Sequence, residues 1–129
     1  MGQKYLIDTN VIGHLFADRL PEASKIFVKE VVNDAFIISV AVEIEALTYH
    51  ETPDKMPLIE EFINLATILP LDEAVTKKAI ELRRNNRKLK LGDAIIAATA
   101  MVHELTLLTN NTKDFIKING LKVIDSHKI

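Results

Sequence analysis

The sequence predicts an α/β domain built around a parallel sheet. Short apolar runs rich in β-forming residues alternate with longer amphipathic segments along the chain, a pattern typical of parallel strands joined by right-handed helical crossovers. The short runs have no polar face of period two, as expected for strands that are buried on both faces. The length of 129 residues suits one core. We therefore expect a single domain over residues 1–129, with a central sheet of four to five strands.

Composition excludes several classes of protein. Hydrophobic residues make up 48% of the chain, charged residues 26%, and the net charge is -2, which argues against coating nucleic acid through bulk charge but allows a local basic groove. Cysteine is absent, which excludes disulfides, thiolate metal sites and cysteine nucleophiles and suits a reducing cytosol. The apolar run over residues 94–102 is too short to cross a bilayer. We expect a cytoplasmic protein without a signal peptide or membrane association.

The first half of the chain contains two predicted strands. Residues 5–7 form the first strand, and Asp8-Thr9-Asn10 ends it, because these residues favour turns and helix starts. Pro21 opens a helix that ends at residues 33–34. The second strand covers residues 35–38, and Ser39 caps a helix over residues 40–49. The side chains expected on the buried faces of these two helices are Ile26, Phe27, Val31 and Val32 in the first, and Val40, Ile44 and Leu47 in the second.

The second half continues the alternation. A break at residues 52–54 precedes an amphipathic helix over residues 56–65, and residues 67–69 form the third strand. Asp72 caps a helix that extends to about residue 86. A loop over residues 85–91 leads to a helix, opened by Gly92 and Asp93, that is apolar on nearly all sides and therefore belongs in the core. Strands over residues 105–108 and 122–124 flank a short helical turn at Asp114. Apolar positions expected to be buried are Leu58, Ile59, Phe62 and Ile63, and Ala74, Val75, Ile80 and Leu82.

Acidic residues recur at the carboxyl ends of the predicted strands. The carboxyl ends of parallel strands lie at one edge of the sheet, where such folds bind ligands. Converging carboxylates repel one another unless a cation neutralises them, and oxygen-rich sites suit Mg²⁺ or Mn²⁺. Each acid also has a structural alternative, because Asp8 is a good N-cap and Asp93 is favoured at a helix N-terminus by roughly 0.3–1 kcal/mol. The acids are Asp8, Glu43, Glu45, Asp93 and Asp114.

Four stretches carry a resemblance to a known family. LIDTNVI (residues 6–12), ISVAVEIEAL (38–47), GDAIIAATA (92–100) and LTLLTNNTKDF (105–115) occur in this order across most of the chain. Together they resemble PIN-domain ribonucleases, most closely the VapC-type toxins of toxin–antitoxin pairs. The resemblance implies a PIN-like α/β/α sandwich and an endoribonuclease that depends on Mg²⁺ or Mn²⁺. It also implies a homodimer and a cognate VapB-like antitoxin that covers the acidic crevice.

The resemblance assigns roles position by position. Asp8 matches the acid after the first strand, and Asp93 matches the acid before the IAATA helix. The family's glutamate usually follows the serine of the second segment by six residues, which gives Glu45 rather than Glu43, although Val42 stands where threonine is usual. Metal ligands are thus Asp8, Glu45 and Asp93, and Asp114 is a fourth catalytic acid that, with Asn111, orients water or metal. Supporting polar residues are Thr9, Asn10, Ser39, Thr109 and Asn111, whose alternative role is capping and turn formation.

Catalysis is expected to depend on the metal, since the chain has no Gly-rich phosphate loop and its histidines are scattered. A water activated by the ion would attack the phosphodiester and leave a 5′-phosphate and a 3′-hydroxyl. A basic run over residues 77–90 leads into Asp93; it is either a solvated helix face or a phosphate-binding surface for RNA. Candidate RNA contacts are Arg83, Arg84, Arg87, Lys88, Lys90 and Lys113.

Partners and rival functions complete the expectations. The segments over residues 21–33 and 54–65 are candidate interfaces, or else ordinary packing onto the sheet. A catalytically inactive PIN-like module that binds RNA or protein is one alternative, supported by Asn111, where an acid often stands. A receiver-type signalling domain is another alternative, but such a domain requires paired acids after the first strand and an aspartate after a middle strand. Ser39 and Pro70 follow the middle strands here, which argues against it.

Overall fold

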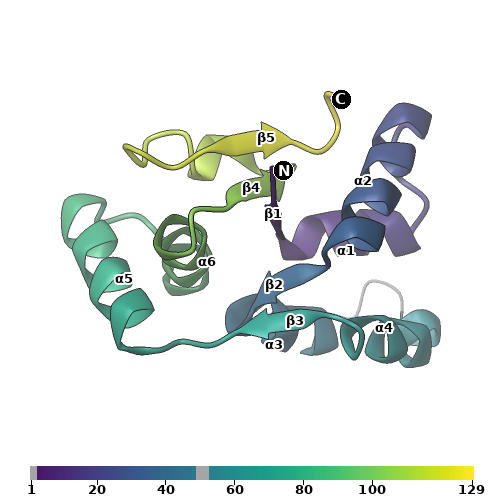
Figure 1. The fold of residues 1–129 in the computed structure, drawn as a ribbon, viewed down its shortest axis with the longest axis horizontal. Coiled ribbons are helices and arrows are strands. Elements are labelled where there is room, and N and C mark those ends of the chain that lie inside the picture. The colour runs from purple at the N-terminus through teal and green to yellow at the C-terminus, as the bar shows by residue number, and fades with distance from the viewer. Residues whose placement is uncertain (1–2, 49–52) are drawn as a thin grey trace.

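In the computed structural model, which describes residues 3–48 and 53–129, five short parallel strands form the centre of the molecule (Figure 1). They are β1 (Tyr5–Ile7), β2 (Ile37–Ser39), β3 (Thr67–Leu69), β4 (Thr106–Thr109) and β5 (Val123–Asp125). Two hydrogen-bonded ladders are present, β1-β4-β5 and β2-β3. Because β1 also lies against β2, the spatial order is β3-β2-β1-β4-β5. This is the α/β architecture that the alternation of segments predicts, with the sheet divided between β1 and β2.

The helices lie around these strands. They are α1 (Thr9–Phe16), α2 (Glu22–Asp34), α3 (Val40–Thr48), α4 (Met56–Ile63), α5 (Glu73–Asn85) and α6 (Leu91–Val102), with 3-10 turns η1 (Pro53–Lys55) and η2 (Thr112–Asp114). Figure 1 shows α5 and α6 side by side on one flank of the strands and α1 and α2 on the other. Within the described ranges, no helix is both long and apolar enough to span a membrane.

Capping residues define where two helices begin, as the sequence predicts. The Oγ of Ser39 accepts a hydrogen bond from the backbone N–H of Val42 at 3.2 Å at the start of α3. The Oδ1 of Asp72 accepts one from the N–H of Val75 at 3.0 Å at the start of α5. These bonds satisfy backbone donors that a helix start otherwise leaves unpaired. The predicted end at Tyr49 and the break at Thr52 lie outside the described residues.

The core is centred on β1, β4 and α6. Leu6, Ile7, Leu107 and Leu108 have no exposed surface, and most of α6 from Ala94 to Ala100 is buried. A helix that is apolar on nearly all sides is expected in this position. Because β1 and β4 are adjacent in the sheet and α6 packs against β4, this core fixes the relative positions of Asp8, Thr109 and Asp93 at its edge.

Several predicted helix faces were wrong. Ile26 of α2 is 52% exposed, Ile44 of α3 59%, Leu58 of α4 57% and Ile80 of α5 46%, and Ala74 is also exposed. Val31, Val75 and Leu82 are buried as predicted, and the other buried positions are Ser24 and Val28 in α2, Ala41, Val42 and Ala46 in α3, and Ala79 in α5. Ser24, Ala41, Ala46 and Ala79 are small residues at these buried positions, whereas the prediction gave most weight to large apolar residues.

Candidate active site

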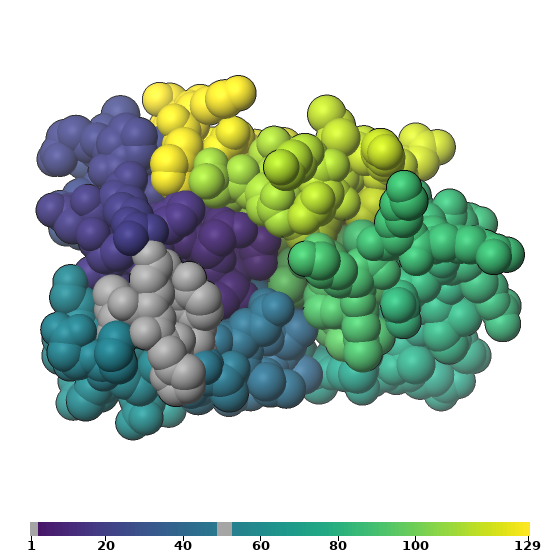
Figure 2. Space-filling model, turned by 180° about the vertical axis from the view of Figure 1, so that it is seen from behind, coloured from purple at the N-terminus to yellow at the C-terminus, as the bar shows by residue number. Residues whose placement is uncertain are grey.

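Three acidic side chains from three separate elements line one crevice at the carboxyl edge of the sheet. Asp8 follows β1, Glu45 lies on α3 and Asp93 lies on α6. The crevice has a volume of about 420 Å³ and is also lined by Thr9, Asn10, Gly13, His14, Thr48 and Asn111. Figure 2 shows the purple N-terminal segment meeting blue, green and yellow-green segments in the middle of this face. The convergence expected for a parallel sheet is therefore present.

Asp8 is held rigidly by three hydrogen bonds. Its Oδ1 accepts from the backbone N–H of Thr9 at 2.7 Å, and its Oδ2 accepts from the Oγ1 of Thr109 at 2.8 Å and the Nδ2 of Asn10 at 3.1 Å. The residue is 5% exposed. Burial raises the pKa of Asp8, and the charge of Glu45 raises it further, while the hydrogen bonds from Thr109, Thr9 and Asn10 oppose this shift. Asp8 thus caps α1, as the structural alternative holds, and also lines the crevice.

Thr109 and Asn10 connect the ends of β1 and β4. Besides donating to Asp8, the Thr109 hydroxyl accepts a hydrogen bond from the N–H of Asn111 at 3.0 Å. The Oδ1 of Asn10 accepts from the N–H of Asn110 at 2.9 Å, and its Nδ2 donates to Thr109 at 3.1 Å. The network orients the Asp8 carboxylate.

Glu45, rather than Glu43, reaches the crevice. The Oγ1 of Thr9 donates a hydrogen bond of 2.6 Å to Oε1 of Glu45, and Glu45 is among the lining residues whereas Glu43 is not. Residues two apart on a helix point in different directions, so only one of the two glutamates can point into the crevice. The spacing of six residues from Ser39 therefore selects the glutamate that lies beside Asp8 and Asp93.

Asp93 lies in the first turn of α6 but is not its N-cap. The N-cap position is Lys90, so a capping bond does not account for this acid. Its pKa is raised to about 6, first by burial and then by the negative charges of Asp8, Asp114 and Glu45, with Lys90 lowering it. A carboxyl group with such a raised pKa sits in the field of several other acids, which is the situation that a bound cation relieves.

The donor set fits a hard divalent cation. Among residues 3–48 and 53–129, no three Asp, Glu or His side chains lie close enough together to hold a metal ion by themselves. Mg²⁺ commonly binds through one or two carboxylates and keeps several waters, so such a close cluster is not required. The residues that would hold the ion are Asp8, Glu45 and Asp93, which supply oxygen donors and negative charge from three elements.

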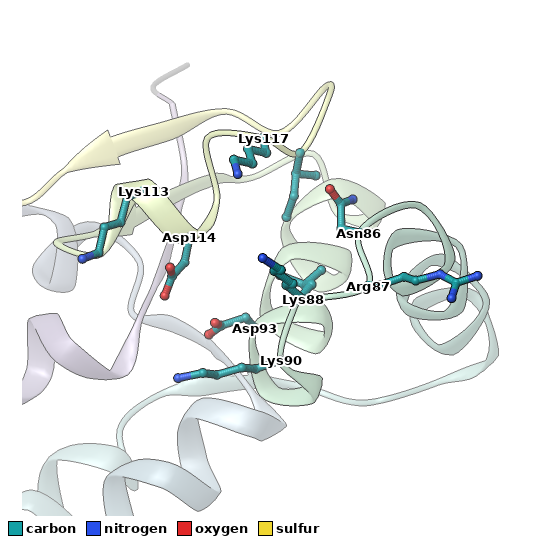
Figure 3. Close-up of a pocket in the computed structure, with 10 residues that line it drawn as sticks. Asn86, Arg87, Lys88, Lys90, Asp93, Lys113, Asp114 and Lys117 are labelled. Carbon is teal, nitrogen blue, oxygen red and sulfur yellow. The ribbon is translucent and has the colours of Figure 1, made fainter.

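A second hollow of about 370 Å³ adjoins the crevice and shares Asp93 with it. Figure 3 shows the carboxylates of Asp93 and Asp114 facing the same space, with Lys90 beside Asp93 and Arg87 pointing outward. The Nδ2 of Asn111 donates a hydrogen bond to Asp114. We call this hollow the basic pocket; it is lined by Asn86, Arg87, Lys88, Leu89, Lys90, Asp93, Lys113, Asp114, Lys117 and Ile118. Asp114 therefore lies beyond Asp93, in this pocket, and only Asn111 lines the crevice itself.

The structure divides the basic run that precedes Asp93. Arg87, Lys88 and Lys90 line the basic pocket, but Arg83 and Arg84 line a different groove between α5 and α6. The Nε of Arg83 donates to the carbonyl of Leu89 at 3.2 Å and so holds the loop between these helices. Farther back, Lys77 pairs with Glu73 at 2.9 Å and Lys78 with Glu81 at 3.0 Å. The structure thus brings the carboxyl end of the run, together with Lys113, to the acids.

Two further placements differ from the sequence-based assignment. Ser39 is fully buried and caps α3 and does not line the crevice. His14 lines the crevice, and its ring lies 4.8 Å, centroid to centroid, from that of His127, although the sequence left these histidines scattered. His14 lies four residues after Asn10 on the same helix, and that spacing places both side chains on one face. This spacing is the signal by which His14 could have been found.

Comparison with known proteins gives one consistent family. The PIN domain model matches residues 5–121. Ribonuclease VapC1 of Rickettsia felis is 40% identical over 73 residues, or 54% of each chain, and the tRNA(fMet)-specific endonuclease VapC of Shigella flexneri is 28% identical over 131 residues, or 95% of this chain and 97% of that protein. A solved chain of a toxin–antitoxin complex from Klebsiella pneumoniae is 28% identical, with a TM-score of 0.75 over 98% of this chain and 100% of that one.

Proposed function

The chain belongs to the PIN-domain family, and on that premise we propose that its acidic crevice hydrolyses RNA phosphodiester bonds with the help of Mg²⁺ or Mn²⁺. The observation that carries the proposal is the convergence of Asp8, Glu45 and Asp93 from three elements on one crevice. RNA as the substrate class is supported by the two relatives, which are named as a ribonuclease and a tRNA-specific endonuclease.

The side chains divide the work of hydrolysis between them. Asp8, Glu45 and Asp93 would hold the divalent ion, which would supply an acidified water and neutralise charge on the phosphate. Thr109 and Asn10 keep the Asp8 carboxylate oriented. Lys88, Lys90 and Lys113 contact backbone phosphates of RNA next to the crevice. Asp114 and Asn111, which are hydrogen-bonded to each other, orient water at the junction with the basic pocket. The products would carry a 5′-phosphate and a 3′-hydroxyl.

We further propose that the protein is the toxin of a toxin–antitoxin pair and acts in the cytoplasm. The similar chain from Klebsiella pneumoniae comes from a toxin–antitoxin complex. A VapB-like antitoxin would inhibit the enzyme by placing an arginine against the crevice carboxylates, since such pairs form strong bidentate hydrogen bonds. Surface for this partner and for a homodimer is available on α2 and α4, where Ile26 and Leu58 are more than half exposed.

The experiment is cleavage of a mixed RNA pool by the purified protein free of antitoxin. Reactions contain Mg²⁺, Mn²⁺ or EDTA, and they are repeated with Asp93→Asn and with Glu43→Gln, an acid of α3 that lies outside the crevice. We expect cleavage that requires metal, disappears in Asp93→Asn and persists in Glu43→Gln. A folded, metal-loaded protein that binds RNA without cutting it would favour the inactive binding module. Cleavage that survives in Asp93→Asn would contradict the site assignment.

A further inference from the structure

Two helical glycines lie at or beside the acidic crevice: Gly13 of α1 lines it, and Gly92 of α6 directly precedes the lining residue Asp93. Neither has a φ in the left-handed region, where glycine is favoured. The backbone therefore accepts alanine at both positions, and glycine weakens a helix relative to alanine. A reason for glycine at either position must come from its surroundings.

The surroundings of the two glycines differ. A Cβ at Gly92 would lie 3.2 Å from Oε2 and 3.9 Å from Cδ of Glu45, whereas a Cβ at Gly13 would meet nothing within 4 Å. A carbon–oxygen contact of 3.2 Å is tighter than an ordinary van der Waals contact, so a methyl group at Gly92 would displace the carboxylate of Glu45 by a few tenths of an ångström. No comparable neighbour explains Gly13.

The other oxygen of the same carboxylate is held by α1. Oε1 of Glu45 accepts a hydrogen bond of 2.6 Å from the Oγ1 of Thr9. Glu45 is an exposed residue on α3, and a long exposed side chain normally samples several rotamers. Here it is confined between a hydroxyl on one side and the bare Cα of Gly92 on the other. Gly92 directly precedes Asp93, so this arrangement holds the carboxylate of Glu45 beside that of Asp93.

We propose that Thr9 and Gly92 are positioning residues that together fix the Glu45 carboxylate at the crevice, Thr9 by a hydrogen bond and Gly92 by leaving room. The proposal rests on the proposed nuclease function only for its effect on catalysis. Its structural part, an energetic coupling between residues 92 and 45, does not depend on any activity.

The first test measures kinetics in Gly92→Ala, Thr9→Val and Thr9→Ser. We expect Gly92→Ala and Thr9→Val each to lower kcat about tenfold, because small displacements of catalytic groups carry large costs. KM for RNA should stay within about twofold, since neither residue belongs to the basic pocket. Thr9→Ser retains the hydroxyl and should recover most of the loss. Equal losses in Thr9→Val and Thr9→Ser, or an unchanged kcat in Gly92→Ala, would overturn the proposal.

The second test is a double-mutant cycle on the Tm of the metal-free protein, which needs no cleavage. In a Glu45→Ala background the obstacle is gone, so Gly92→Ala should raise Tm by roughly 2–4 °C through helix propensity. With Glu45 present the same substitution should raise Tm less or lower it. Gly13→Ala is the matched control and should give the same shift in both backgrounds.

The two proposals fail in distinguishable ways. If the wild-type protein does not cleave RNA but Gly92 and Glu45 are energetically coupled, the proposed nuclease function is wrong and the proposed positioning of Glu45 stands. If the wild-type protein cleaves RNA but Gly92→Ala shifts Tm equally in both backgrounds, the nuclease function stands and the proposed positioning of Glu45 is wrong. If Gly92→Ala fails to fold even in the Glu45→Ala background, glycine is needed for packing of α6 and the proposal is wrong.

Discussion

The acidic crevice and the basic pocket share Asp93 but are built differently. In the crevice Asp8 is 5% exposed and accepts three hydrogen bonds, and Glu45 is held by Thr9. In the basic pocket the cationic side chains of Arg87, Lys88, Lys90, Lys113 and Lys117 belong to exposed residues. Fixed groups can stabilise charge that develops in a reaction without reorganising, whereas exposed cations mainly attract phosphates in a salt-dependent way.

This difference predicts a division of kinetic effects. Changes in the crevice should lower kcat, because they alter groups that act on the reacting phosphate. Changes in the basic pocket should raise KM and alter its salt dependence. Charges of both regions act on Asp93, since Asp8, Glu45 and Asp114 raise its pKa and Lys90 lowers it. Substitutions on either side of Asp93 therefore test whether the two regions are separate in function.

The largest effect is expected for Asp8→Asn. The substitution keeps the size of the side chain but removes a charge that would hold the cation, so kcat should fall on the order of a thousandfold. The Tm of the metal-free protein should change little, because removing a charge that burial disfavours is offset by the loss of one oxygen that accepts a hydrogen bond. Parallel RNA-cleavage assays and thermal melts measure the two quantities.

Asp72→Asn is the matched control for Asp8→Asn. Asp72 also caps a helix through its side chain, but it lies outside the crevice, and asparagine is an equally good N-cap. Both kcat and Tm should be nearly unchanged. A loss of activity in Asp72→Asn equal to that in Asp8→Asn would show that capping, rather than the carboxylate at the crevice, explains the result.

The next largest effect is expected for Thr109→Val, which has the same shape without the hydroxyl. The change removes the donor to Oδ2 of Asp8 and the acceptor for the N–H of Asn111. The free energy of unfolding should fall by about 1–3 kcal/mol, the cost of leaving buried polar groups unpaired, and kcat should fall about tenfold. Urea denaturation and single-turnover cleavage measure these changes. An unchanged kcat would mean that Asp8 keeps its orientation without Thr109.

A smaller and different effect is expected for the double variant Lys88→Ala/Lys113→Ala. The loss of two phosphate contacts should raise KM about fivefold. It should also make the plot of the logarithm of the RNA-binding constant against the logarithm of the salt concentration less steep by about 1.4, since each contact to a single strand contributes about 0.7 to the slope. The kcat should be unchanged. The control is Lys77→Ala, because Lys77 pairs with Glu73 on α5. A fall in kcat without a change in KM would contradict the separation of the two regions.

Much of the fold follows from local sequence. The position of each strand is predicted to within two residues, as at residues 67–69, because a short apolar run ended by polar or breaking residues has few other interpretations. The buried faces of α2, α3 and α5 were less predictable. Ile44 and Ile80 are exposed while Ala46 and Ala79 are buried, since the distance between packed helices selects small side chains and the sequence does not contain that distance.

The candidate site shows the same limit. The crevice acids Asp8, Glu45 and Asp93 could be chosen from motif and spacing, because Asp8 ends a strand, Asp93 lies in the first turn of a helix and Glu45 follows Ser39 by six residues. Arg83 was assigned to RNA from its place in a basic run, yet its guanidinium bonds to the carbonyl of Leu89. The run continues through a turn between α5 and α6, and a charge count along the sequence cannot show which side of that turn each cation faces.

The smallest effect concerns the pH dependence of stability in the metal-free protein. Asp93 has a pKa of about 6 when folded and about 4 when unfolded. The folded state therefore binds the proton more tightly, so stability should fall as pH rises from about 4 to about 6, and the loss should be complete above pH 6. Because Asp93 is only partly buried, we expect roughly 0.5–1 kcal/mol rather than the full value for a shift of about two units.

Urea denaturation in EDTA at pH 5 and pH 7.5 measures this difference. Asp93→Asn should reduce it, leaving the part due to Asp8, whose pKa is also raised. Addition of Mg²⁺ at pH 7.5 should restore stability in the wild-type protein more than in Asp93→Asn, because a ligand that binds the folded state stabilises it. If Asp93→Asn retains the whole pH dependence of stability, the raised pKa of Asp93 is not its source. The charges of the crevice and of the basic pocket would then not both act on Asp93.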